Sequence, residues 1–192
     1  MALDENALVT WEKTQSLLGL DASDQGKYES LINAASAIAN KYTLRNLKAR
    51  DYTHVLDGSG NKDLLLPQYP INSITSVHVD IDRDFNDETE ITEYLHYDEE
   101  GILYYEEEFP DIRQTVKVVY NAGFPAASIP EDIQMAVVEI VVWLAGRLND
   151  SGVGIGIRQI EGPGGGTTEY EMTIPLAAQR KLEPYVRREG GI

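Results

Sequence analysis

The stretch of sequence that decides the fold is PEDIQMAVVEIVVWLAGRLN, residues 130–149. Its proline suits the first turn of a helix, and the two acids that follow complement the positive end of the helix dipole. Its only strongly polar interior side chains are Gln134, Glu139 and Arg147. A helix that is apolar on nearly all sides must be covered on nearly all sides. We therefore expect it to lie both in the core and at a contact with a second subunit. The residues expected at that subunit interface are Met135, Val138, Val142 and Trp143.

Shorter helices are predicted on both sides of this stretch. An apolar stripe that starts after Thr10 and stops at Gly19 predicts a helix over 10–18. Apolar residues recurring at helical spacing predict a longer helix over 25–42. A last helix is expected over 175–184, because one proline can open it and another stops it.

Residues 51–121 have the pattern of strands rather than helices. Apolar and polar side chains alternate along 77–81, so Ile81 is expected on a buried face. They alternate again along 115–120, which predicts another strand there. The acidic turn before residue 102 predicts a hairpin of strands 91–97 and 102–105. We expect five or six short antiparallel strands in this segment.

The predicted fold class is mainly α with a β insertion (α+β), a small helical bundle that carries short antiparallel strands. We expect one domain, residues 1–192, with the bundle formed by 1–50 and 122–192 and the insertion by 51–121. Residues 151–169 hold seven glycines and are predicted to form a flexible loop within the bundle.

Composition excludes several functional classes. The 192 residues carry 32 acidic and 16 basic side chains, a net charge of −16. Proteins that bind nucleic acid or anionic membranes use basic patches, so neither class fits. Without cysteine there are no disulfides, thiolate nucleophiles or cysteine-bound metals. We expect no signal peptide, because the first nine residues lack a basic segment, and no membrane span, because Glu139 interrupts the longest apolar stretch.

The acids are concentrated in residues 80–111, which contain 14 of them. Asp82, Asp84 and Glu93 match ligand positions of a calcium-binding EF-hand loop, but Asp87 stands where that loop needs glycine, and the flanks read as strands. We therefore expect a solvated acidic surface and no specific metal site.

Other catalytic and cofactor motifs are also incomplete. The glycines at 152–156 follow a helix rather than a strand, and no GK[ST] follows them, so they do not form a phosphate loop. His54, His78 and His96 lie on different predicted strands, with no helical pair to bind zinc. No serine has the GxSxG context of a hydrolase. We expect no catalytic residue, no metal and no cofactor, and hence no enzyme.

A series of phrases follows the helix–insertion–helix layout along nearly the whole chain. They are ALVT (7–10), LINAAS (31–36), LP (66–67) with PINSITSV (70–77), VVYNAGF (118–124), IPEDI (129–133) and LEPY (182–185). In this order they resemble the head–tail connector (adaptor) proteins of tailed bacteriophages. The acidic segment 80–111 and the long glycine loop depart from that family's pattern.

The resemblance implies a ring of about twelve copies that docks under the portal protein of the phage head. Such a ring extends the DNA channel and offers a platform to a tail or stopper protein, while DNA passes without specific binding. It implies a location at the head–tail interface of the virion, after synthesis in the host cytoplasm, with no role at a membrane. The residues expected to contact the portal are Arg180, Lys181, Tyr185, Arg187 and Arg188.

Two other functional classes are open at this stage. An acidic DNA-mimicking inhibitor would be a monomer or dimer with its acids spread along one face. A divalent-metal-dependent enzyme would be built on Asp82, Asp84 and Glu93.

Overall fold

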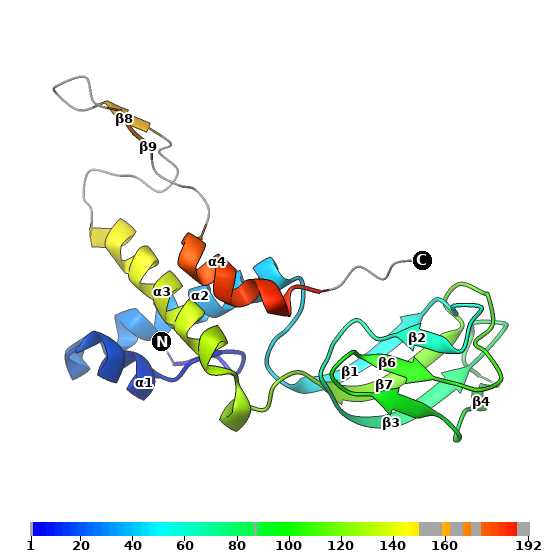
Figure 1. The fold of residues 1–192 in the computed structure, drawn as a ribbon. Helices are drawn as coiled ribbons and strands as arrows, with labels where there is room; N and C mark the ends of the chain where they lie inside the picture. Colours follow the sequence, from blue (N-terminus) through cyan, green and yellow to red (C-terminus); the bar gives the residue numbers. More distant parts are fainter. Residues whose placement is uncertain (1, 87, 150–158, 162–166, 170–173, 188–192) are drawn as a thin grey trace. The chain divides into compact units, whose positions relative to one another are not determined.

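The computed structural model describes residues 2–86, 88–149, 159–161, 167–169 and 174–187 (Figure 1). The chain divides into two compact units, each with its own core. The helical unit comprises Met1–Leu44 and Ile129–Val186, and the β unit comprises Arg45–Ser128 with Arg187–Ile192. Helices and antiparallel sheets together confirm the predicted α+β class.

The helical unit confirms the predicted helices. They are α1 (Trp11–Leu18), α2 (Gln25–Thr43), α3 (Glu131–Asn149) and α4 (Leu176–Leu182), with 3₁₀ turns at Ala22–Asp24 and Glu183–Tyr185. The Thr10 hydroxyl accepts the N–H of Lys13 at 3.2 Å and so caps α1, and Gly19 ends it with φ 63°. None of the helices in the described ranges is both long enough and apolar enough to cross a bilayer.

The core of the helical unit lies where α3 packs on α2 and α4. Ile32, Ala35 and Ala39 of α2 are fully buried. Opposite them lie the buried α3 side chains Ile133, Ala136, Val137, Ile140 and Val141, and α4 adds Ala178 and Leu182. Each fully buried leucine or isoleucine contributes about 1.5–3 kcal/mol relative to an exposed one.

The β unit contains two antiparallel sheets that share one core. In the first sheet the order is β1 (Arg50–Leu56), β7 (Val116–Ala122), β3 (Ile71–Val79) and β4 (Thr89–Glu90). In the second it is β2 (Asp63–Leu65), β6 (Ile102–Tyr104) and β5 (Leu95–Tyr97). Val77, Val118 and Tyr120 of the first sheet cluster with Leu64 and Leu103 of the second. The alternation along 116–120 therefore predicted the central strand correctly.

The segment 91–97 does not form the single strand that was expected. Thr89–Glu90 pairs with β3 in the first sheet, and the Ile91 N–H donates to the Val77 carbonyl at 2.8 Å. Leu95–Tyr97 instead pairs with β6 in the second sheet. The chain passes from one sheet to the other here, so residues 92–94 belong to neither strand.

Ile81 is exposed, so its predicted burial is wrong. The strand β3 ends at Val79, because the carboxylate of Asp80 then turns the chain by accepting the N–H groups of Asp82 and Phe85, at 2.9 and 2.6 Å. Beyond this turn the alternation of the strand no longer decides which side chains face the core.

Residues 48–50 and 122–124, near the two ends of the 45–128 segment, are bonded to each other, and we call this pair of segments the closed stem. Lys48 and Phe124 form a parallel bridge, the Ala49 N–H donates to the Phe124 carbonyl at 2.9 Å, and Arg50 pairs with Ala122. Gly123 has φ 107°, and a Cβ there would lie 2.8 Å from the backbone of Lys48. The stem therefore requires glycine, which supports both a positive φ and this close approach.

Two further strands lie in the glycine-rich segment that was expected to be a loop. β8 (Gln159–Glu161) and β9 (Thr167–Glu169) pair antiparallel. The remainder of that predicted flexible loop, including the glycines at 152–156, lies outside the described residues.

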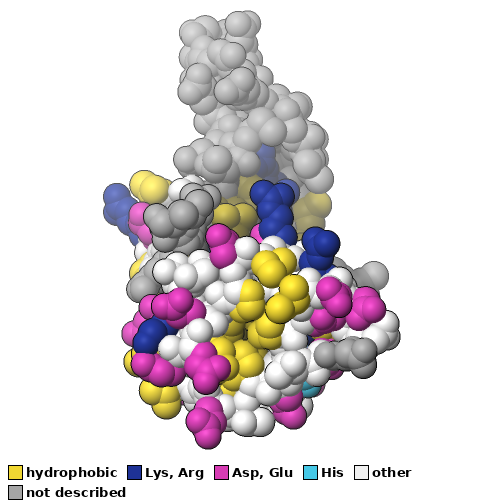
Figure 2. All heavy atoms as spheres, turned by 90° about the vertical axis from the view of Figure 1, so that its right-hand side faces the viewer, with side chains coloured by type: hydrophobic (Ala, Val, Ile, Leu, Met, Phe, Trp, Pro, Cys, Tyr) yellow, Lys and Arg dark blue, Asp and Glu magenta, His cyan; other side chains and the backbone are white. Residues whose placement is uncertain are grey.

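The β unit carries most of the negative charge. Between Arg45 and Ser128 there are 17 acidic and 7 basic residues, a net charge of −10. Figure 2 shows a side of this unit on which hydrophobic side chains gather in a stripe with Asp and Glu side chains on either side.

Candidate assembly interface

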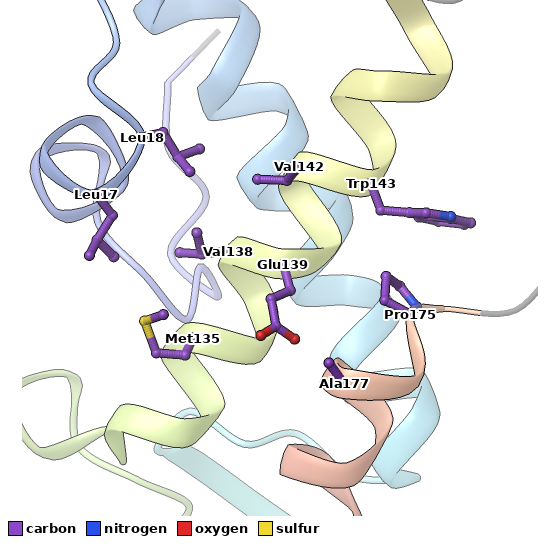
Figure 3. A pocket seen from close by; sticks show the side chains of 9 residues that line it. All are labelled: Leu17, Leu18, Met135, Val138, Glu139, Val142, Trp143, Pro175 and Ala177. Atoms are coloured by element: carbon purple, nitrogen blue, oxygen red, sulfur yellow. The ribbon is translucent and has the colours of Figure 1, made fainter.

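An apolar groove lies between α1, α3 and α4 of the helical unit (Figure 3). Its volume is about 460 Å³. The four residues predicted to form a subunit interface all line it, and five others complete it. The full lining is Leu17, Leu18, Met135, Val138, Glu139, Val142, Trp143, Pro175 and Ala177.

The sequence of α3 explains why the groove exists. Its lining residues at 135, 138, 139, 142 and 143 follow helical spacing, so they share one face of the helix. The buried residues at 133, 136, 137, 140 and 141 form another face, which α2 and α4 cover. Thus α3 has two apolar faces, and the described part of the unit covers one of them fully and the other only in part.

The groove has a buried floor and an open rim. Val138 is 4% exposed, whereas Val142, one turn further along α3, is 49% exposed. Leu17 of α1 is also exposed, and Met135 and Trp143 are partly buried. The guanidinium of Arg147 lies 4.8 Å from the centre of the Trp143 ring, a cation–π contact along α3. The apolar rim is therefore accessible to another protein surface.

One carboxylate interrupts the apolar lining. Oε1 of Glu139 accepts a hydrogen bond from Nζ of Lys181 at 2.6 Å, an ion pair between α3 and α4. Lys181 is one of the residues expected to contact the portal. In the structure its ammonium group instead helps to hold α4 beside the groove.

A second predicted portal residue is also engaged within the helical unit. The Tyr185 hydroxyl lies 2.9 and 2.8 Å from the two carboxylate oxygens of Asp132, to which it donates. This bond joins the turn after α4 to the first turn of α3. Arg180 and Arg187 are exposed, and Arg188 lies outside the described residues. Of the five predicted portal residues, Arg180, Lys181 and Tyr185 thus lie in the helical unit, whereas Arg187 belongs to the β unit.

The acidic segment 80–111 contains a turn formed around Asp80. The N–H of Phe85, and after it those of Asp82, Arg83 and Asp84, lower the pKa of Asp80 from its usual value. Among the residues with a defined placement, no three or more His, Asp or Glu side chains are arranged to hold a metal ion.

The histidines lie on separate strands, as expected. His54 on β1 is 3.0 Å from the Tyr120 hydroxyl, and burial lowers the pKa of His54 and raises that of Tyr120. His78 on β3 lies 3.7 Å from a Glu88 oxygen. The ring of His96 on β5 lies 2.6 Å from Asp98, a residue of the turn that follows the strand.

Sequence reasoning missed the other walls of the groove. Leu17 and Leu18 belonged to a predicted helical stripe, and Pro175 was expected to open the last helix, but nothing placed either beside α3. The available signal was the excess of apolar residues on α3, which indicates an uncovered face without naming its neighbours.

Comparison with known proteins gives one family and several similar structures. The family model described as head completion protein matches residues 7–179. No curated protein matches the sequence significantly. The neck of an empty gene transfer agent (GTA) particle, computed with C6 symmetry, contains a chain of similar fold, with a TM-score of 0.65 and 18% sequence identity.

Two further structures of that particle give similar values. The neck of the native GTA particle, computed with C12 symmetry, has a TM-score of 0.62 and 19% identity. The virion of the native particle has a TM-score of 0.61 and 18% identity. In all three the match covers 100% of this chain and 96% of the other chain. At this level of identity the similarity establishes a shared fold over the full length.

Proposed function

The chain belongs to the head completion protein family, and from that premise we propose that it is the connector between head and tail in a phage-like particle. Its copies form a ring that docks beneath the portal, extends the DNA channel and offers the tail a platform. The role is structural rather than catalytic. The location at the neck of the particle is supported by the shared fold with subunits of the GTA neck.

The observation that carries this proposal is the uncovered apolar face of α3. A groove of about 460 Å³ with an exposed leucine and valine at its rim is unfavourable in water. A second copy of the chain can cover it. When a groove on one copy receives a different surface of the next, repetition of the contact around an axis closes a ring.

The number of copies and the charge fit the same role. The GTA neck was computed with C6 and C12 symmetry, and we propose about twelve copies here. A net charge of −16 per chain repels phosphate groups, so a ring of such chains lets DNA slide without binding it.

The ring proposal is tested by charging the open rim of the groove. Val142→Glu should leave the subunit folded, within about 0.5 kcal/mol, because Val142 is half exposed. It should prevent ring formation, since a carboxylate would be buried in an apolar contact. Circular dichroism reports the fold, and sedimentation velocity reports the assembly.

The matched control is Val55→Glu, the same change at a half-exposed valine of β1 in the other unit. This variant should form rings as the wild type does. Rings of normal size from Val142→Glu would refute the groove as the subunit contact.

We place the portal contact in the basic C-terminal region, through Arg180, Arg187 and Arg188. Arginine is favoured at interfaces because it pairs with carboxylates through two parallel hydrogen bonds. Lys181 and Tyr185 then contribute by holding α4 in place, given their bonds to Glu139 and Asp132.

The portal contact is tested with the double variant Arg180→Glu/Arg187→Glu, which should form rings that no longer bind portal-bearing heads. Its control, Arg83→Glu/Arg113→Glu, makes the same change of charge at two exposed arginines of the β unit. Loss of binding in both variants would mean that net charge, rather than this region, governs docking. Truncation after Glu183 is a less specific test, because it also removes the Tyr185 bond.

A further inference from the structure

The outer face of the second sheet of the β unit is mainly apolar, and within the described part of the chain three of its large side chains are exposed. Strand register places Leu65, Ile102 and Tyr97 in one row across the sheet, and Asp63, Tyr104 and Leu95 in the next row. Side chains in such rows are direct neighbours, with Cβ atoms about 4.5–5.5 Å apart. We define the outer sheet face as Leu65, Leu95, Tyr97, Ile102 and Tyr104.

The alternation of the strands explains why this face is outside. Leu64 of β2 and Leu103 of β6, which point the opposite way, are buried in the core of the β unit. Leu65, Leu95 and Tyr97 are 51%, 60% and 49% exposed. A strand in a solvated sheet normally carries polar residues on its outer side, so three large exposed apolar side chains on the two strands that flank β6 indicate an interaction surface.

Acidic residues border the outer sheet face in the sequence on three sides of its strands. Glu93 precedes β5 by two residues, the turn from β5 to β6 contains Glu99 and Glu100, and Glu106 follows β6 by two residues. Lys62 is bonded to Glu106 at 2.6 Å, and Glu106 also accepts the hydroxyl of Tyr104. The border is therefore strongly negative.

We propose that the outer sheet face binds a different protein, one whose surface has apolar side chains at its centre and lysine or arginine around them. Charge complementarity selects this partner. A second copy of the chain would bring one acidic border against another, at a cost for each pair of like charges. Nucleic acid and anionic lipid carry the same sign of charge as the border and are excluded for the same reason.

This inference does not depend on ring formation by the helical unit. The probe is a synthetic fluorescent peptide of alternating leucine and tyrosine flanked by lysines, and its counterpart is flanked by glutamates. Binding to the full-length protein is measured by fluorescence anisotropy. We expect the lysine peptide to bind and the glutamate peptide to bind at least tenfold more weakly.

The variant Leu95→Ser/Tyr97→Ser removes apolar surface and keeps every charge. It should weaken binding of the lysine peptide at least tenfold, and Val55→Ser, at an exposed valine outside the face, should leave binding unchanged. Leu65→Ser, on the opposite edge strand, gives an independent reading if the double variant does not fold. Val142→Glu should bind the peptide like the wild type, which separates this surface from the groove.

Three results would each overturn the proposal. Equal binding by the wild type and the serine variants would mean that charge alone attracts the peptide. Equal binding of the two peptides, or no binding of either, would mean that the acidic border selects nothing. A change in ring size caused by Leu95→Ser/Tyr97→Ser would make the face a contact between copies.

Discussion

The groove of the helical unit and the outer sheet face of the β unit are both apolar at the centre, but their borders differ. One carboxylate lines the groove, that of Glu139, and Lys181 pairs with it. The sheet face has several acids around it, and Lys62 beside it is already bonded to one of them, Glu106. Burial of apolar area supplies affinity at both surfaces, whereas the charge at the border decides which partner is accepted.

This difference in border charge distinguishes the proposed contact between copies of this chain from the proposed contact with a different protein. Copies of one chain carry the same net charge and repel each other, so a contact between copies is favoured by a surface without a strongly charged border. A surface that binds a different protein gains specificity from such a border, because the border disfavours binding of a second copy. In our proposal the two units thus divide the work of assembly, and the predictions below probe each unit in turn.

The largest effect is expected from a charge on the floor of the groove. Val138 is 4% exposed, so Val138→Asp would bury a carboxylate among apolar side chains. This change should destabilise the subunit by about 4 kcal/mol or more. Val142→Asp, at the rim, should change the stability by less than about 0.5 kcal/mol. Urea unfolding followed by circular dichroism measures both. Equal losses of stability in the two variants would contradict the assignment of Val138 to a buried floor and Val142 to an open rim.

A cavity in the β unit should have a smaller and local effect. Leu103→Ala removes a fully buried side chain from the core of that unit and should cost about 3 kcal/mol. Hydrogen exchange should accelerate in β2, β5 and β6 and stay unchanged in α3, because the units have separate cores. A matching loss of protection in α3 would show that the two units unfold together.

The bond between Tyr185 and Asp132 should contribute less again. Tyr185→Phe removes a hydroxyl that donates to a carboxylate and should cost the helical unit about 1–2 kcal/mol. Tyr28→Phe, in α2, serves as the control. Thermal unfolding measures both variants, and binding to portal-bearing heads should weaken only to the extent that α4 loosens. Full stability with complete loss of head binding would instead make the Tyr185 hydroxyl a direct portal contact.

The smallest expected effect is a pH dependence confined to the β unit. Backbone N–H groups hold the pKa of Asp80 below its unfolded value near 3.8, so the stabilisation is complete above that pH and is lost as the pH falls through the folded pKa. The stability difference between the wild type and Asp80→Asn should therefore be constant from pH 5 to 7 and shrink in acid. Exchange of the Phe85 amide measures it, and a difference that grows in acid would contradict the assignment.

The helices and the central strand could be predicted because each leaves a periodic signal in its own sequence. The two apolar faces of α3 could also be predicted from the spacing of its apolar residues. Which of the two faces the subunit covers could not be predicted, because that depends on where α2 and α4 pack against α3. The same holds for the Lys181–Glu139 and Tyr185–Asp132 bonds, which join residues 42 and 53 positions apart.

The strands of residues 89–104 show a second limit of sequence reasoning. The hairpin signal of the acidic turn predicted one strand over 91–97, but residues 89–97 take their hydrogen bonds from β3 at one end and from β6 at the other. Periodicity reports which side chains can share a face and carries no information on which sheet supplies the partner. For the same reason the outer sheet face could not be found before the register was known.

The closed stem of the β unit has a consequence for how such proteins diversify. The chain leaves α2 and returns to α3 through two segments that are already held together by the Lys48–Phe124 bridge, with Gly123 allowing their close approach. The helical unit is therefore connected to two neighbouring chain ends, whatever lies beyond them. Evolution can exchange, enlarge or shrink the module on this stem without altering the helices, so on the proposed division of roles a lineage can adapt to a new tail while it keeps its old ring.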